Sequence, residues 1–199
     1  MREIKSFFNS QINEHQKIVE KTRTLSNSFT KSVEICSDSL KKNKKLLFFG
    51  NGGSASDAQH LSTELSVRFS KNRRAIAAIS LVTDTSTLTA IGNDFGFDFL
   101  FSRQIEAIGK PGDVVVAITT SGKSKNVIKG LEVAKKMGLR SIVLTGKYTK
   151  KIEKLCDQII SIPADNTSRV QEMHIMLGQM LCNAIEFNLG LASLVKEER

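Results

Sequence analysis

The chain has 199 residues, of which 40% are apolar and 25% are charged, a composition typical of a globular protein with one sizeable core. No apolar run approaches the roughly 18–20 residues that a membrane span needs, so we expect no membrane protein. The N-terminal sequence lacks the apolar core of a signal peptide, and three cysteines without CxxC spacing argue against a disulfide framework. These features predict a cytoplasmic protein.

The charge balance of 29 basic and 20 acidic residues gives a formal net charge of +9. The basic residues form short, scattered clusters, and the chain has no tryptophan and one tyrosine, so no stacking platform for nucleic acid is visible. An anionic small-molecule substrate explains the positive charge equally well. The sequence therefore makes a nucleic-acid partner a weak hypothesis.

The order of elements predicts an α/β fold. Residues 3–42 have the apolar spacing of two helices, and a long helix is expected from Arg169 to about Leu194. Between them, helical patterns at 54–69, 98–109 and 124–137 alternate with short apolar runs. These runs, which predict strands of a parallel sheet covered on both faces, are residues 45–50, 75–83, 113–120, 141–146 and 157–163.

The domain organisation follows from the absence of any linker or repeat. We expect a single domain, residues 1–199, with N-terminal helices at 1–44, an α/β core at 45–166 and a long C-terminal helix at 167–199. The N-terminal helices are too apolar to stay in water alone, which makes a homo-oligomer plausible.

The first candidate ligand loop is a strand-to-helix junction at residues 48–60. Its glycines, Gly50, Gly52 and Gly53, allow positive φ and a close backbone approach, and Ser54 or Ser56 could cap the following helix. Such a junction points N–H groups at an anion, although Ala55 breaks the Rossmann GxGxxG pattern. The alternative is a tight turn without a ligand.

The second candidate loop, residues 117–127, suits a phosphate monoester because hydroxyl groups precede a helix start. It is a near miss to the P-loop, since Ala117 replaces the first glycine. A Ser/Thr-rich helix cap is the alternative interpretation. The hydroxyls belong to Thr119, Thr120, Ser121 and Ser124.

Polar residues elsewhere could complete a site. His60 and Glu64 share one helix face, where they could bind a metal ion or handle a proton, or form an ordinary surface pair. Gln171 opens the last helix, where a simple polar helix start is the alternative. The segment with Asn93 and Asp94 predicts a loop apt for binding hydroxyls, or merely a turn.

Four segments together resemble the sugar isomerase (SIS) domain of the bacterial phosphoheptose isomerase family: residues 48–65, 91–109, 112–127 and 167–179. The resemblance implies a three-layer, flavodoxin-like fold with a five-stranded parallel sheet, and a homotetramer. It implies conversion of sedoheptulose 7-phosphate into D-glycero-D-manno-heptose 7-phosphate, for the heptose of lipopolysaccharide or capsule. Many members of the family bind zinc.

The resemblance also implies roles for individual residues, with Glu64 as the catalytic base. The implied zinc ligands are His60, Glu64, Gln171 and Gln179. The implied substrate contacts are Asn51, Gly52, Gly53, Glu64, Asn93, Asp94, Thr119, Thr120, Ser121, Ser124 and Gln171.

The chain departs from the family pattern at Gln179, where the family has a histidine that binds the metal and acts as the catalytic acid. Glutamine is a weaker zinc ligand and cannot shuttle a proton. His174 on the same helix is an alternative acid. Gln171 and Gln179 are about 12 Å apart along a helix, which predicts a site between subunits.

Two functions from different classes follow from this pattern. The first is an aldose–ketose isomerase that works through an enediol, with the hydroxyls of the second loop anchoring the phosphate. The second is a non-catalytic SIS-domain regulator that binds the replication initiator protein. Gln179 favours the regulator, whereas the retained pair of His60 and Glu64 favours the isomerase.

Overall fold

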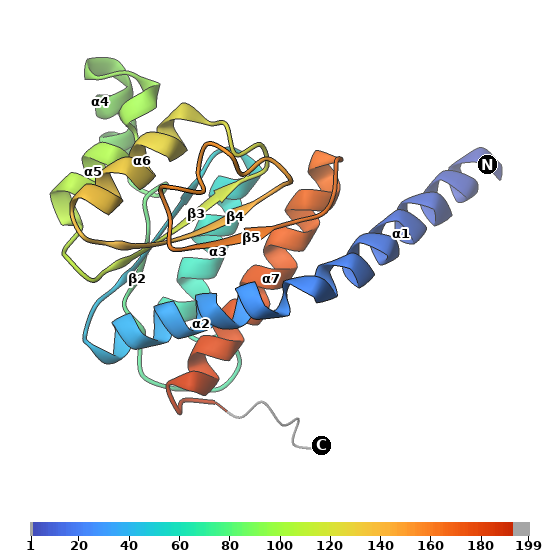
Figure 1. Cartoon of the computed structure of the whole chain (residues 1–199), viewed down its shortest axis with the longest axis horizontal. Coiled ribbons are helices and arrows are strands. Elements are labelled where there is room, and N and C mark those ends of the chain that lie inside the picture. The colour runs from blue at the N-terminus through green and yellow to red at the C-terminus, as the bar shows by residue number, and fades with distance from the viewer. Residues whose placement is uncertain (1, 193–199) are drawn as a thin grey trace.

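The computed structural model describes residues 2–192 and shows a parallel five-stranded sheet between two layers of helices (Figure 1). The strands lie in the order β2-β1-β3-β4-β5, and every pair is parallel. This confirms the predicted fold class. The strands are β1 (Leu46–Gly50), β2 (Ala78–Ser80), β3 (Val114–Thr119), β4 (Arg140–Thr145) and β5 (Gln158–Ser161).

The two faces of the sheet are covered by different helices because successive side chains of a strand point to opposite sides. Leu46 and Phe48 of β1 pack in one core cluster, whereas Leu47 and Phe49 pack in the other. The first cluster is covered by α2 (Ser26–Lys41), α3 (Gly53–Ser66), α7 (Thr167–Asn188) and the end of α1 (Arg2–Thr22). The second is covered by α4 (Thr85–Asp94), α5 (Ser102–Ile108) and α6 (Lys125–Lys136).

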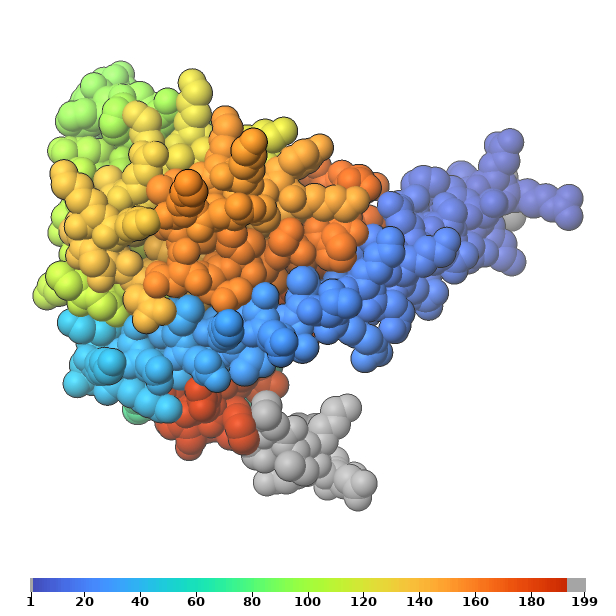
Figure 2. Space-filling view, viewed as in Figure 1, coloured from blue at the N-terminus to red at the C-terminus, as the bar shows by residue number. Residues whose placement is uncertain are grey.

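Helix α1 projects away from the body of the molecule, as the space-filling view shows (Figure 2). Its first three turns expose Ile4, Phe7, Phe8 and Ile12, and Ile18 near its end is buried. A short 3-10 helix, η1 (Arg23–Leu25), joins α1 to α2. The two helices predicted at residues 3–42 are therefore present, with one apolar face uncovered in the single chain.

Three predicted boundaries were wrong. Strand β2 is much shorter than the run at 75–83, because at the sheet edge it pairs with β1 alone. Helix α7 ends at Asn188, because Gly190 at φ +69° closes a Schellman-type turn in which the Leu191 N–H donates to the Glu186 carbonyl. The predicted extension to Leu194, like the rest of 193–199, lies outside the described residues.

The third wrong boundary concerns Asn93 and Asp94, which form the end of α4 and not a loop. A second 3-10 helix, η2 (Phe97–Phe99), follows after Gly96. Within residues 2–192, no helix combines the length and the apolar character that crossing a membrane requires.

Candidate active site

The two candidate loops meet at the point where the strand order reverses. β1 pairs with β2 on one side and with β3 on the other, so the loops after β1 and β3 leave the sheet in adjacent positions. The Asn51 amide donates to Asn126 Oδ1 at 2.9 Å, and the Asn126 amide donates to Asn51 Oδ1 at 2.8 Å. This reciprocal bond fixes the first loop against the start of α6.

The glycine loop (residues 50–53) is shaped by close backbone contacts. Gly52 has φ +56° and is the N-cap of α3, and a Cβ at Gly50 would lie 2.7 Å from the Ile118 carbonyl oxygen. Neither Ser54 nor Ser56 caps the helix, because the N-cap position falls on Gly52 and no side chain accepts a bond there. The predicted serine cap was wrong, whereas the predicted need for glycine is confirmed.

The hydroxyl loop (residues 119–124) presents three of its four hydroxyl side chains to solvent. Thr120, Ser121 and Ser124 are half-buried, and Ser124 is the N-cap of α6 without a side-chain capping bond. Thr119 is 4% exposed, and its hydroxyl accepts the Gly122 N–H at 3.3 Å. Thr119 therefore shapes the loop, while the other three hydroxyls are available to an anion.

Close packing of α3 and α7 brings the predicted catalytic residues together. A Cβ at Gly178 would lie 2.5 Å from a methyl carbon of Leu61, so glycine is what allows the two helices to approach. Where α3 and α7 touch, His60 Nε2 lies 2.9 Å from Glu64 Oε1 and 2.9 Å from Gln179 Nε2. Three of the four predicted metal ligands thus converge within one chain.

Gln171 is placed differently. Its amide packs on Gly53, where a Cβ would collide with it, at the start of α3. Gly53 and His60 are seven residues apart, about 10 Å along a helix. Gln171 and Gln179 therefore contact different parts of α3, Gly53 and His60, within the same chain. The predicted site between subunits stays a prediction.

His174 is unsuited to be the catalytic acid. The side chain is fully buried, and burial lowers the pKa of its imidazole to about 4, so it is neutral near pH 7. Within the described residues neither ring nitrogen has a hydrogen bond of good geometry. His174 is a core residue.

Asn93 and Asp94 lie apart from the other predicted site residues. The Asn93 amide donates to Asp94 Oδ1 at 2.8 Å, and both residues are exposed. In the part of the chain that the structure describes, no hydrogen bond or ion pair joins them to either candidate loop or to His60 and Glu64.

Comparison with known proteins identifies the family. Residues 8–146 match the SIS domain family. A phosphoheptose isomerase from Geotalea daltonii is 53% identical over 181 residues, covering 90% of this chain and 94% of the relative. Phosphoheptose isomerase 1 of Campylobacter jejuni is 50% identical over 173 residues, covering 87% and 93%.

A solved structure agrees with these relatives. The structure of phosphoheptose isomerase from Neisseria gonorrhoeae has a TM-score of 0.87 at 37% identity, and the match covers 92% of this chain and 99% of that chain. The chain belongs to the phosphoheptose isomerase family.

The donor set found in this family member fits a divalent cation only in part. Ligands of a tetrahedral zinc ion lie roughly 3.3 Å apart when each is 2.0–2.1 Å from the metal, close to the 2.9 Å separations around His60 Nε2. His60 and Glu64 are ordinary zinc ligands, but Gln179 must turn its amide oxygen inward. Within residues 2–192, no group of three His, Cys, Asp or Glu side chains could hold a metal.

Several residues that hold this site together carry little signal in the sequence. Asn126, which bonds Asn51 at the start of α6, and Gly178, which lets α7 approach α3, were not among the predicted site residues. Arg73 and Glu186 form a buried ion pair with 2.6 Å between Arg73 Nη2 and Glu186 Oε1. A signal for the last pair was available, because Glu186 is an acid within an otherwise apolar helix face and requires a buried partner.

Proposed function

We propose that the chain is a phosphoheptose isomerase that converts sedoheptulose 7-phosphate into D-glycero-D-manno-heptose 7-phosphate. The single observation that carries this proposal is the contact of His60 with Glu64 on the helix that starts at the glycine loop. That loop is bonded through Asn51 to the start of α6, directly after the hydroxyl loop. The proposed proton-handling pair thus lies on the helix that starts beside the proposed anion-binding loop.

In the proposed reaction the hydroxyl loop binds the distal phosphate. Thr120, Ser121 and Ser124 donate hydrogen bonds to it, which holds the reacting carbons of the open-chain sugar against Glu64. Glu64 removes the C1 proton of the ketose and returns a proton to C2 through an enediol, while the hydroxyl proton of O1 passes to O2 as the carbonyl moves from C2 to C1. Its Oε1 is oriented for this by His60 at 2.9 Å.

Gln179 separates this chain from the family pattern. Its amide can orient a substrate oxygen by a hydrogen bond but cannot transfer a proton. We propose that His60, Glu64 and Gln179 hold zinc. Gln171 lies beside Gly53, too far along α3 to join them within one chain, and would take part only from a neighbouring subunit. Zinc, when bound, would polarise the carbonyl and the adjacent hydroxyl. The amide ligands predict weaker zinc binding than a histidine at 179 would give.

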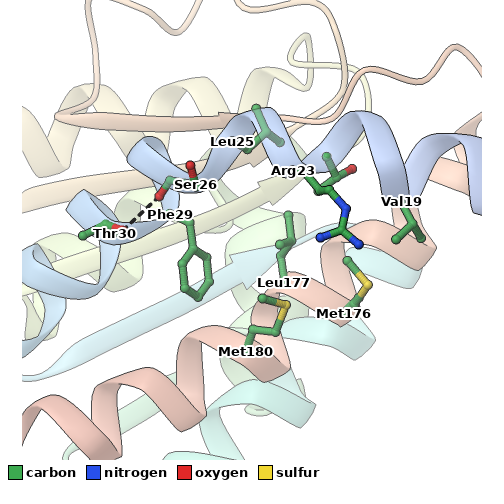
Figure 3. A pocket seen from close by; sticks show the side chains of 10 residues that line it. Val19, Arg23, Leu25, Ser26, Phe29, Thr30, Met176, Leu177 and Met180 are labelled. Carbon is green, nitrogen blue, oxygen red and sulfur yellow. Dashed lines mark hydrogen bonds between the residues drawn. The ribbon is translucent and has the colours of Figure 1, made fainter. Parts of the chain in front are cut away.

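We further propose a homotetramer with sites between subunits. Two apolar surfaces support it: the exposed face of α1 and a groove of about 380 Å³ between the end of α1, α2 and α7. Figure 3 shows Phe29, Leu177 and Met180 pointing into this groove. A second copy would cover both surfaces, and a neighbouring subunit would bring a hydroxyl-binding pair, Asn93 and Asp94, to a site that lacks one within the chain.

The setting that we propose is the cytoplasm, where the three free cysteines of the described chain would stay reduced. The product would serve the heptose of lipopolysaccharide or capsule. The alternative of a regulator that binds the replication initiator protein is not favoured, because relatives at about 50% identity are named as isomerases.

The test is the rate of conversion of sedoheptulose 7-phosphate by the wild type and by Gln179→His, each with added zinc and with a chelator. We expect turnover by the wild type that falls with the chelator. We expect a faster reaction in Gln179→His, by up to the roughly 10²–10⁴-fold that a general acid supplies. A wild type that binds the sugar phosphate but never converts it would leave the regulator as the better account.

A further inference from the structure

A buried ion pair lies just behind Glu64. The side chains of Arg73 and Glu186 are only 3% and 0% exposed. Arg73 Nε and Nη2 lie 2.7 Å and 2.6 Å from Glu186 Oε1, which also accepts the Phe69 N–H at 3.1 Å. Burial of two charges is costly, and Oε1 takes these hydrogen bonds while the buried Oε2 has no partner within the described residues. The bonds from Arg73 and from the Phe69 N–H hold the segment after α3 in one conformation.

The same guanidinium bonds to the end of α3. Arg73 Nη2 donates to the backbone carbonyl of Glu64 at 2.8 Å, and Nη1 donates to the carbonyls of Val67 and Arg74 at 3.0 Å each. A cation at a helix C-terminus is favourable because the last carbonyls lack partners within the helix. Arg73 therefore contacts the very residue whose carboxylate faces His60.

Helix α7 carries both contacts to α3. Gln179 touches His60, and Glu186 lies seven residues further along α7, about two turns, where Arg73 links it to the Glu64 backbone. Two separate contacts, one at His60 and one at the Glu64 backbone, thus fix α3 against α7 along the part of α3 that carries His60 and Glu64.

We propose that Arg73 and Glu186 are positioning residues that hold Glu64 in place for proton transfer. The inference rests on the proposed role of Glu64 as the base. Arginine is required because its planar fork donates to Glu186 and to three carbonyls at once. Lysine could keep the ion pair but has a single nitrogen for all of these acceptors.

The experiment compares Arg73→Lys with the wild type in two measurements. We expect kcat to fall about tenfold to a hundredfold while KM stays within about twofold, because the phosphate is bound by a different loop. We also expect the ring resonances of His60 to shift in NMR spectra, because Glu64 moves relative to the imidazole. Arg140→Lys is the matched control, since Arg140 at the start of β4 pairs at 2.8 Å with Asp157, directly before β5, and the variant should leave both readouts unchanged.

Glu186→Asp provides a second variant if Arg73→Lys does not fold, since a shorter carboxylate draws the guanidinium away from the Glu64 carbonyl. A folded variant with wild-type kcat and an unshifted His60 resonance would overturn the proposal, as would equal effects in Arg140→Lys. The NMR readout needs no turnover. A wild type without isomerase activity therefore refutes the proposed function, whereas an unmoved His60 refutes the positioning role.

Discussion

The hydroxyl loop and the contact between α3 and α7 are held in place by different means, although both belong to one proposed site. The loop itself is shaped by a local turn, in which Gly122 adopts φ +61° and its N–H donates to the Thr119 hydroxyl. The α3–α7 contact depends on residues far apart in sequence, such as Gln179 and His60. The proposed phosphate-binding loop therefore takes its shape from a local turn, whereas the placement of Glu64, the proposed base, depends on tertiary packing.

This difference predicts that the two regions control different kinetic constants. Changes at the α3–α7 contact should lower kcat, because they remove or displace the group that moves the proton. Changes of single hydroxyls in the loop should raise KM, because they remove a binding contact that exists in both ground and transition states.

The largest effect is expected for Glu64→Gln, which keeps the shape of the side chain and removes its basicity. Turnover of sedoheptulose 7-phosphate should fall by about 10²–10⁴-fold, the range that a general base supplies. Binding of the sugar phosphate, measured by calorimetry, should remain. Gln59→Glu, on an exposed position of the same helix, is a control for charge and should retain turnover. Loss of sugar-phosphate binding in Glu64→Gln would show that Glu64 is needed to bind the substrate, which contradicts its assignment to the proton transfer alone.

A smaller effect is expected for Gly178→Ala, which places a methyl group against Leu61. Overpacking should lower the free energy of unfolding by about 1–3 kcal/mol and reduce kcat, because α7 moves away from His60. Gly92→Ala is the matched control, since no atom lies within 4 Å of its Cβ position in α4. It should be neutral or stabilising by up to about 1 kcal/mol in denaturant melts. Equal stability of the two variants would show that the helices do not depend on glycine here.

The smallest effect is expected for Ser121→Ala in the hydroxyl loop. Loss of one hydrogen bond to a charged phosphate costs about 1.5–3 kcal/mol at most, and the Ser121 hydroxyl is shared with the Lys123 N–H, so KM should rise about tenfold. The constant kcat should stay near that of the wild type. A fall in kcat without a change in KM would contradict the prediction that the hydroxyl loop controls KM and the α3–α7 contact controls kcat.

The sequence was sufficient for the parts of the molecule that local patterns control. Short runs with apolar residues at both odd and even positions predicted a parallel sheet, because the strands of such a sheet are buried on both faces. The glycine and hydroxyl loops could be located because each follows such a run. Asn93 and Asp94 were misplaced, because the polar residues at the end of α4 resemble a turn and the helix is decided by contacts of its buried residue, Ile91.

The parts that could not be predicted depend on long-range contacts. Nothing local to Gln179 shows that its amide reaches His60, 119 residues away, and helix geometry alone suggested a partner subunit. Arg73 and Glu186 are separated by 113 residues, so their pairing becomes visible only in the folded chain. Gly190, by contrast, was a readable stop signal for α7 that the periodic pattern of the last helix concealed.

The most direct test of the central claim is proton NMR of sedoheptulose 7-phosphate incubated with the purified wild type in D₂O. If Glu64 carries the proton between C1 and C2, aldose signals of the heptose 7-phosphate appear and deuterium enters at the carbons of the enediol. Unchanged sugar signals, with zinc or without it, in a sample that demonstrably binds the sugar phosphate would show that the protein does not isomerise this substrate.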